Sequence, residues 1–218
     1  MTWDLAKIVL GYLLGSVSGS LLLGRLRGVD IRQQGSGNAG GTNAFRTQGF
    51  WFALSVALVD VGKSALAAWL GRCGIVDSGH ALHVALLAGA AAAVGHVWPL
   101  YFGFRGGKGV GAVVGVLLVL WPAAVAVMVG VVLLVLTTTG FVGLGSMLAG
   151  VALIPLAALC APEPHRLTWV VAAVAIAGFI IFTHRSNLRR LRAGTEHRFE
   201  GARVLARLFA KLRGKPAA

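Results

Sequence analysis

Charge is scarce in this chain of 218 residues, and acidic charge is the scarcest. Only 12% of the residues are charged, and seven Asp and Glu stand against twenty Lys and Arg. A soluble domain carries about twice that charged fraction. Cysteine is rare as well, because Cys73 and Cys160 are the only two and show neither a CxxC pair nor metal-ligand spacing. These shortages exclude a disordered chain, a coiled coil and a disulfide-stabilised secreted scaffold.

Apolar residues dominate what remains. They make up 57% of the chain, and the mean hydropathy is +0.80, which predicts an all-α polytopic membrane protein. The net charge of +13 would suit a nucleic-acid partner, but in so apolar a chain the positive-inside rule explains it better. We therefore expect no nucleic acid and no obligate protein partner. The N-terminus lacks the basic region and cleavage site of a secretory signal, so the first apolar run is expected to be retained.

The apolar runs predict seven transmembrane spans. Residues 109–162 contain no Asp, Glu, Lys or Arg, far more than the about 20 residues that one span needs. Trp121-Pro122 and the polar turn at 137–140 divide this stretch. The first piece, 110–120, is short for a bilayer. The predicted spans are 3–23, 50–71, 80–102, 110–120, 122–136, 141–160 and 168–183.

Basic residues set the orientation of these spans. Loop 24–49 holds four Arg, loop 103–109 holds two basic residues, and the segment after residue 183 holds ten. Loops 72–79 and 161–167 carry one basic and one acidic residue each. The three basic regions should face the cytoplasm, which requires an odd number of spans. Seven spans, with the N-terminus outside and the C-terminus cytoplasmic, satisfy this; five spans would have the same parity.

The end of the chain differs from the spans. Within 200–213, apolar residues recur at helical spacing with basic residues between them: Val204, Leu205, Leu208, Phe209 and Leu212, against Arg203, Arg207, Lys211 and Arg213. This pattern is typical of a basic amphipathic helix on an anionic membrane surface, although a solvated tail helix is the alternative. The chain thus divides into one transmembrane domain, 1–199, and a basic tail, 200–218.

Glycine and polar residues gather in three segments that share the predicted cytoplasmic face. The first is GSGNAGGTN at 35–43, followed by Arg46; the second is GHVWPLYFGFRGGKG at 95–109; the third is HRSNLRRLRAGTE at 184–196. Residues 35–40 match G-x-G-x-x-G, but no strand precedes them, so a dinucleotide fold is rejected. Residues 105–109 also miss the P-loop pattern, because Gly109 follows Lys108.

The physics of these loops indicates a phosphate or carboxylate site. Glycine lets backbone N–H groups approach an oxyanion closely. Neutral donors and cations accompany the glycines: Ser36, Asn38, Thr42, Asn43, Arg46, Arg105 and Lys108. The glycines at 11, 15 and 19 have a simpler explanation, because their small-xxx-small spacing is typical of helix packing.

Four ionisable residues leave alternatives open. His96 and His184 end predicted spans, and each is either a satisfied interfacial histidine or a participant in the site. Asp60 and Lys63 lie inside a span at i, i+3 spacing, which favours a structural ion pair over residues that line the site. No histidine has metal-ligand company, so we expect no metal and no cofactor.

Together the three segments resemble the bacterial acyl-phosphate:glycerol-3-phosphate acyltransferases, the PlsY family. The resemblance runs from about residue 11 to 200. This chain departs from the usual motifs at Gly41 (Ala), Trp98 (Phe), Arg105 (Lys) and Leu188 (Ile). The sequence DVGK at 60–63 resembles a weaker family element, with Ser64 in place of a frequent glycine. The acyltransferase box His-x4-Asp is absent.

The resemblance implies a bacterial inner-membrane enzyme of phospholipid synthesis with its site on the cytoplasmic face. It would move a fatty acyl group from acyl phosphate to the sn-1 hydroxyl of glycerol 3-phosphate, giving lysophosphatidic acid and phosphate. The predicted catalytic residues are Ser36, His96, Lys108, His184 and Asn187. The predicted substrate-binding residues are Asn38, Gly40, Gly41, Thr42, Asn43, Arg46, Gly106, Gly107 and Arg185. Either histidine or the departing phosphate would take the hydroxyl proton, and Glu196 would orient the Arg-rich segment.

Two other functions remain open at this point. A transporter of an anionic, phosphate-bearing solute would also be compatible with seven spans and with Asp60 and Lys63 inside the bilayer. Transporters, however, often show related halves, and this chain shows no internal repeat. A lipid-binding scaffold would not require His96, Lys108 and His184 together.

Overall fold

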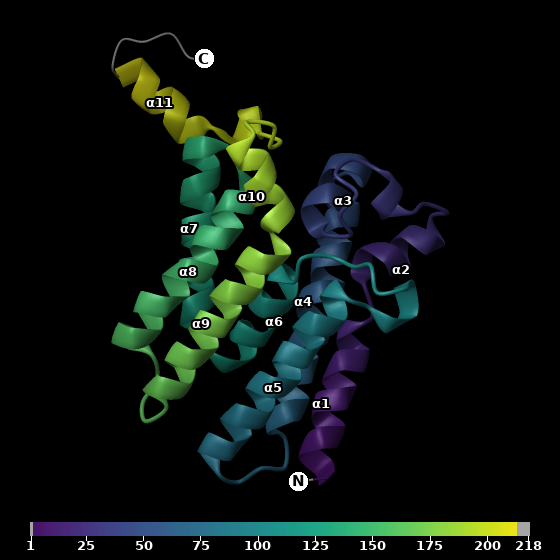
Figure 1. Cartoon of the computed structure of the whole chain (residues 1–218), viewed down its shortest axis with the longest axis vertical. Coiled ribbons are helices and arrows are strands. Elements are labelled where there is room, and N and C mark those ends of the chain that lie inside the picture. The colour runs from purple at the N-terminus through teal and green to yellow at the C-terminus, as the bar shows by residue number, and fades with distance from the viewer. Residues whose placement is uncertain (1, 213–218) are drawn as a thin grey trace. The chain divides into compact units, whose positions relative to one another are not determined.

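The chain is helical throughout the part that the structure describes (Figure 1). The computed structural model describes residues 2–212, with side chains as far as Leu208. The α-helices of that part are α1 (Thr2–Gly15), α2 (Gly19–Leu26), α3 (Gly41–Gln48), α4 (Phe50–Arg72), α5 (Ser78–Val97), α6 (Val110–Leu120), α7 (Pro122–Thr139), α8 (Val142–Cys160), α9 (Arg166–Thr183), α10 (Arg185–Arg192) and α11 (Val204–Leu212). Short 3-10 helices are η1 (Ile31–Gln33), η2 (Leu100–Phe102) and η3 (Glu200–Ala202).

Most of the predicted spans are long apolar helices. Among residues 2–212, five helices are long and apolar enough to cross a membrane, namely α4, α5 with η2, α7, α8 and α9. The predicted division at Trp121-Pro122 is confirmed, because α6 ends at Leu120 and α7 begins at Pro122. The second division is present at Gly140, but the predicted turn at 137–140 is wrong in extent, because Thr137, Thr138 and Thr139 continue α7. The protein is thus a multi-pass membrane protein. The short α6 has 11 residues and is only about 16 Å long.

The first span departs from the sequence prediction. Residues 3–23 are not one straight helix, because α1 and α2 meet at a 45° bend across residues 16–18. The two helices together pass the length and apolarity test, so they form one broken span or a re-entrant loop. Glycines border the break on both sides, at Gly15 and Gly19, and glycine is a weak helix former. Hydropathy does not register this weakness.

The structure divides into two compact units, Met1–Ala123 and Ala124–Ala218. In the first unit, α1 packs on α5 and α4 packs on α5 and α6. Small residues allow these close approaches, since a methyl group at Gly11 or Gly15 would overlap the backbone of Ala88 or Ala92. Gly115 of α6 meets the carbonyl of Val61 in the same way. The predicted packing role of Gly11 and Gly15 is therefore confirmed.

The two basic loops of the first unit lie together, away from the start of α1. At one end Lys7 donates to the carbonyl of Cys73 over 2.5 Å, so the start of α1 lies beside the α4–α5 connection (Figure 1). At the other end Arg32 donates to the carbonyl of Phe102 over 3.0 Å, which joins the two basic loops. The two basic loops of this unit therefore share one end, opposite the N-terminus.

In the second unit, α8 packs on α9, and α10 contacts both. The chain after α10 returns to the α7–α8 turn, where the N–H of Phe199 donates to Gly140 over 2.9 Å and Arg198 donates to Thr139 over 2.9 Å. The predicted tail helix is present as α11, Val204–Leu212. The side chains of Phe209, Lys211 and Leu212 and all of Arg213 lie outside the described residues.

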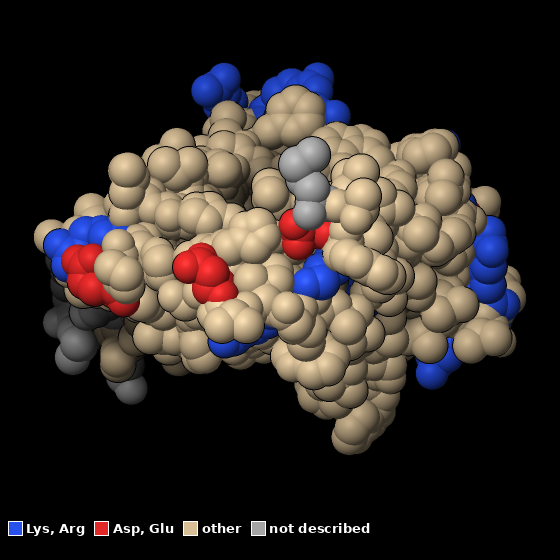
Figure 2. All heavy atoms as spheres, turned by 90° about the horizontal axis from the view of Figure 1, so that it is seen from below, with Lys and Arg blue, Asp and Glu red and all other residues tan. Residues whose placement is uncertain are grey.

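The surface of the described helices is largely apolar. Leu58, Val171 and Leu159 are 67%, 61% and 75% exposed, each on a long helix. The face in Figure 2 shows the same character, with wide uncharged areas and few acidic atoms. Water would not favour so much exposed hydrocarbon, whereas a bilayer would.

Candidate active site

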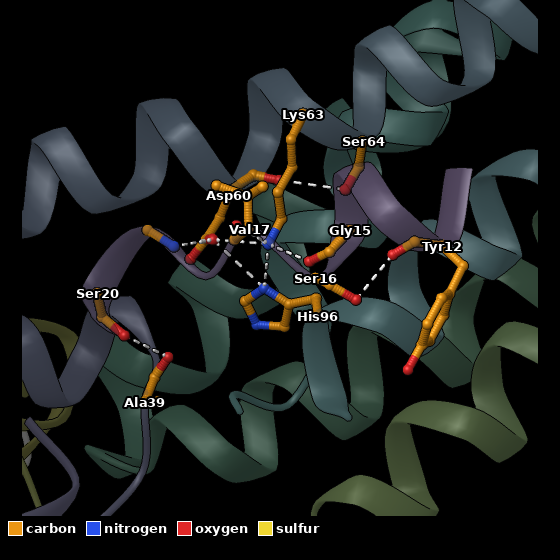
Figure 3. A network of polar contacts seen from close by, with 11 residues as sticks. Tyr12, Gly15, Ser16, Val17, Ser20, Ala39, Asp60, Lys63, Ser64 and His96 are labelled. Atoms are coloured by element: carbon orange, nitrogen blue, oxygen red, sulfur yellow. Dashed lines mark hydrogen bonds and ion pairs between the residues drawn. The ribbon is translucent and has the colours of Figure 1, made fainter. Parts of the chain in front are cut away.

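The break in the first span is held by a lysine from another helix. The carbonyls of Gly15 and Val17 have no partner within α1 or α2, because the helix stops there. Lys63 of α4 donates to both, over 2.7 Å each (Figure 3). Its side chain is only 5% exposed. The C-terminal end of a helix carries partial negative charge, so the ammonium group satisfies both the hydrogen bonds and the field.

Asp60, one turn earlier on α4, holds the other side of the break. Its Oδ1 accepts the N–H of Gly19, the first residue of α2, over 3.0 Å. The same oxygen lies 3.1 Å from Nζ of Lys63 and 3.3 Å from Nδ1 of His96. Nζ of Lys63 also lies 3.1 Å from Nδ1 of His96. The expected Asp60–Lys63 ion pair is present. His96, which the sequence left as either an interfacial histidine or a participant in the site, contacts both members of the pair.

His96 connects this pair to the second glycine loop. It lies in the last turn of α5 and is 3% exposed. The N–H groups of Gly106 and Gly107 donate back to the carbonyls of Val97 and His96, over 3.0 and 3.1 Å. A methyl group at Gly107 would overlap Nε2 of the imidazole. Only glycine therefore fits where the loop crosses the ring.

The first glycine loop meets the second at the same place. A methyl group at Gly107 would also lie 3.0 Å from the carbonyl oxygen of Ala39. That oxygen accepts the hydroxyl of Ser20 over 2.8 Å, so α2 fixes the first loop (Figure 3). Two segments that are far apart in sequence, 35–43 and 105–109, are thus brought together within the first unit.

Asn43 shapes the first loop from inside. Its amide group donates to the carbonyls of Ile31 and Gln34, over 3.1 and 2.9 Å, and its Oδ1 accepts the N–H of Ser36 over 2.9 Å. The side chain is 1% exposed. A methyl group at Gly35, which has φ +54°, would overlap Oδ1 of Asn43. The amide predicted to bind substrate is thus occupied by the loop backbone.

Arg32 ties the two basic loops together. It pairs with Asp30 through Nη2 and Oδ2 over 2.8 Å, and its Nη1 reaches the carbonyls of Phe102 and Arg105 over 3.0 and 3.4 Å. The hydrogen bonds from Arg32 hold the pKa of Asp30 below its ordinary value of 3.8. No motif in the sequence marks Arg32 as a residue that joins the loops.

The other predicted residues of these loops surround two helix N-termini. Gly41 begins α3, with Gly40 before it and Thr42 after it, and a methyl group at Gly41 would meet nothing. Lys108 is half-buried and precedes Gly109, the N-cap of α6. Helix N-termini favour anions. Other predicted residues lie in the same loops: Ser36 and Arg105 are exposed, and Asn38 and Arg46 are half-buried.

The third polar segment forms its own network in the second unit. Glu196 accepts from Asn187 through Oε1 and from Arg190 through Oε2, over 2.7 Å each. Asn187 is 6% exposed, and a methyl group at Gly143 of α8 would lie 2.7 Å from its amide nitrogen. The expected contact of Glu196 with the Arg-rich segment is confirmed.

His184 joins α9 to α10. It is 4% exposed, and its Nδ1 lies 2.9 Å from the carbonyl oxygen of Ile180. A carbonyl can only accept, so Nδ1 carries the proton and a neutral ring keeps its lone pair on Nε2. Arg185 is exposed and lies over the ring of Phe182, 4.5 Å from its centroid. Among the described residues, no three His, Cys, Asp or Glu side chains gather as a metal site would need.

Comparison with known proteins places this sequence in one family. Residues 5–194 match the family model for glycerol-3-phosphate acyltransferase. The chain belongs to the glycerol-3-phosphate acyltransferase family. The acyltransferase of Symbiobacterium thermophilum is 44% identical over 191 residues, covering 87% of this chain and 92% of that one. The acyltransferase of Shouchella clausii is 44% identical over 199 residues, covering 89% and 95%.

Solved structures agree with the sequence relatives. A crystal structure of PlsY, an integral membrane glycerol 3-phosphate acyltransferase in its glycerol 3-phosphate form, superposes with a TM-score of 0.81. It is 33% identical and covers 93% of this chain and 98% of that one. Its lysophosphatidic acid form gives a TM-score of 0.80 at 32% identity. The predicted family is therefore confirmed.

Three residues of this acyltransferase hold the site from outside its three polar segments. Arg32 and Ser20 hold the glycine loops through backbone carbonyls, and no pattern in a sequence marks such acceptors. Lys63 could have been identified from the sequence, because a lysine inside an apolar span needs buried partners. Those partners are carbonyls of another helix, and the sequence could name only Asp60.

Proposed function

We propose that this membrane acyltransferase uses an acyl phosphate as donor and acylates the sn-1 hydroxyl of glycerol 3-phosphate. The products are lysophosphatidic acid and inorganic phosphate. The observation that carries the proposal is the meeting of two glycine loops at Gly107 and Ala39, beside His96 and next to Lys108. Both proposed substrates carry phosphate, and backbone N–H groups with nearby cations are suited to bind it.

The reaction needs no covalent enzyme intermediate. The mixed anhydride of acyl phosphate is already activated, so the glycerol hydroxyl attacks the acyl carbon directly. The bond between that carbon and the phosphate oxygen breaks, and phosphate leaves. Positioning of the two substrates and stabilisation of the oxyanion supply the catalysis. The hydroxyl proton passes to a neutral histidine, His184 or His96, or to the departing phosphate.

We assign the predicted residues to two groups. The acyl phosphate and the developing oxyanion are held by Ser36, Asn38, Gly40, Gly41, Thr42, Gly106, Gly107 and Lys108. Glycerol 3-phosphate is held by Arg46, Lys108, Arg185 and Asn187. Asn43 contributes through the loop that it shapes, because its amide is occupied by backbone partners.

The proposed site lies on the cytoplasmic face of the inner membrane, in a chain of seven spans with its N-terminus outside. The shared end of the two basic loops in the first unit supports this orientation, as does the positive-inside rule. Cys160 provides a native probe, because it is exposed and would face outward. In a Cys73→Ser background, a membrane-impermeant thiol reagent should label intact cells at Cys160. Labelling only after permeabilisation would reverse the orientation.

The basic tail is proposed to lie on the cytoplasmic membrane surface. Val204 and Leu208 of α11 are 60% and 49% exposed, and the segment before them is anchored at the α7–α8 turn. Removing residues 204–218 leaves that anchor in place. Turnover of the full-length enzyme in nanodiscs should depend on the fraction of anionic lipid, and turnover of the shortened enzyme should not. An unchanged dependence would mean that the tail is solvated.

A turnover assay tests the reaction. Purified enzyme receives labelled glycerol 3-phosphate with palmitoyl phosphate or with palmitoyl-CoA. Lysophosphatidic acid should form from the acyl phosphate alone and be lost in Lys108→Ala. Arg166→Ala serves as a matched control, because Arg166 is an exposed cation paired with Glu163 at the start of α9. Product from palmitoyl-CoA would refute the proposal that acyl phosphate is the donor. No product from either, in monodisperse protein, would favour anion transport, which uptake by liposomes would measure.

A further inference from the structure

The buried cluster of Asp60, Lys63 and His96 lies outside both glycine loops but contacts the second one through the imidazole ring. All three side chains are at most 5% exposed. We propose that Asp60 and Lys63 are positioning residues for acyl transfer, which hold the imidazole of His96 against the second glycine loop. This proposal rests on the proposed function, and it gives the ion pair a task beyond joining helices.

Holding the helix break does not require the histidine. Lys63 has three N–H donors, and two of them go to the carbonyls of Gly15 and Val17. Asp60 accepts the N–H of Gly19. These contacts already satisfy the ends of α1 and α2. Lys63 has one N–H donor left, and Asp60 Oδ1 can still accept a further hydrogen bond. Both groups lie close to each other and to Nδ1 of His96.

This arrangement fixes which way the imidazole faces. Both members of the ion pair contact Nδ1, at 3.1 and 3.3 Å, so Nε2 points away from them. Nε2 lies against Gly107, where a methyl group would overlap it. Turning the ring over would replace Nδ1 with carbon beside two charged groups and would leave them without that contact. The pair therefore selects one of the two ring orientations.

The ring, the loop and the end of α5 behave as one body. The N–H groups of Gly106 and Gly107 donate to the carbonyls of Val97 and His96. A shift of the imidazole would therefore also move the backbone of the loop, including Gly107, which precedes Lys108. Displacement of a catalytic group by about 1 Å costs on the order of 100-fold in rate. Loss of the ion pair should thus reduce kcat although neither residue touches substrate.

The test is a variant that removes both charges at once. Removing one alone would leave an uncompensated buried charge, which is strongly destabilising. In Asp60→Asn with Lys63→Gln, the asparagine keeps an oxygen for Gly19 and the glutamine keeps N–H donors for the carbonyls at the break. Ser64→Ala is the matched control, because this buried hydroxyl bonds to the carbonyl of Asp60 within α4 and no described contact joins it to His96.

The proposal predicts a kinetic signature that a structural role alone would not produce. The paired variant should stay monodisperse and lose about 100-fold in kcat, with the KM for glycerol 3-phosphate changed less than about threefold. His96→Gln should lose a similar factor. Combining the two changes should give no further loss beyond His96→Gln, because both act through one ring. Ser64→Ala should retain the kcat of the unmodified enzyme.

Several outcomes would overturn the proposal. These are losses that multiply in the combined variant, an unchanged kcat in the paired variant, or full activity in His96→Gln. If the paired variant does not fold, the unmodified enzyme decides the matter by NMR of ¹⁵N-labelled histidine, assigned with His96→Gln. The orientation that the ion pair selects places Nδ1, and not Cδ2, beside the ammonium group of Lys63, so through-space contacts of the Cδ2 proton with Lys63 would refute the proposal. A failure of the proposed donor appears separately, as an unmodified enzyme that makes no product from palmitoyl phosphate.

Discussion

Replacing Gly107 with alanine should stop the enzyme without unfolding it. The added methyl group would overlap Nε2 of His96 and would lie 3.0 Å from the carbonyl oxygen of Ala39 and 3.1 Å from Cε1 of His96. The alanine is therefore confined from two sides, by His96 of α5 and by the first loop. Neither neighbour is the free end of a flexible side chain, because the imidazole is held by Asp60 and Lys63.

The size of the effect follows from contact distances. Non-bonded heavy atoms need about 3.5 Å, so the loop or the ring must move by on the order of 1 Å. Overpacking of this kind costs about 1–3 kcal/mol of stability, which a membrane protein of this size should survive. A displacement of that size at reacting groups costs on the order of 100-fold in kcat. Activity should therefore fall far more than stability.

The assay compares turnover and melting temperature for Gly107→Ala and for Gly62→Ala. Gly62 lies on α4 beside Lys63, and a methyl group there would meet nothing within 4 Å. The control should match or slightly exceed the stability of the unmodified enzyme, because alanine favours helix by about 1 kcal/mol over glycine. Full activity in Gly107→Ala would refute the close contact between the loop and the imidazole.

Three further predictions concern the residues that hold the loops. Asn43→Ala removes three hydrogen bonds to the first loop, so thermal unfolding should show a loss of about 2–3 kcal/mol; an unchanged melting temperature would contradict this. Glu196→Gln weakens the bond to Arg190 and should cost about 1 kcal/mol at low salt; the difference in melting temperature should shrink in high salt, and a salt-independent difference would contradict a charge effect. The lowered pKa of Asp30 means that its contribution to stability is present above pH 3.8 and is lost as the pH falls through the lower folded-state pKa. Melting temperatures of Asp30→Asn and of the unmodified enzyme should therefore converge on acidification, and a constant difference would refute the pairing with Arg32.

The sequence predicted the ends of most helices because their signals are local. Pro122 cannot continue a helix from the preceding turn, and α7 begins there. Gly140 follows three threonines and ends the same helix, with φ +82°. The bend between α1 and α2 was missed because every residue from 15 to 19 is small or apolar. Nothing in that stretch lowers hydropathy enough to indicate a break, and the side chains that hold it, Asp60 and Lys63, come from α4.

The candidate site was predictable in composition but not in its division of tasks. Glycine loops with nearby cations indicated an anion site, and the structure brings two of the three segments together within one unit. The sequence predicted that Ser36 is catalytic and that Asn43 binds substrate, so both were expected to face the substrates. In the structure Oδ1 of the buried Asn43 accepts the N–H of Ser36, so Asn43 shapes the loop that carries Ser36. Only the direction of each side chain separates these tasks.

Lys63 shows how a charge inside a span can report on a different span. A lone lysine at that depth is costly, and Asp60 alone neutralises its charge but fills only one of its three donors. The other two require acceptors, and regular helices have none to offer, because their carbonyls are bonded internally. A broken helix does, so a buried Lys–Asp pair in an apolar span predicts an interruption in a neighbouring one. Here the carbonyls lie 48 and 46 residues earlier in the chain, at the break between α1 and α2.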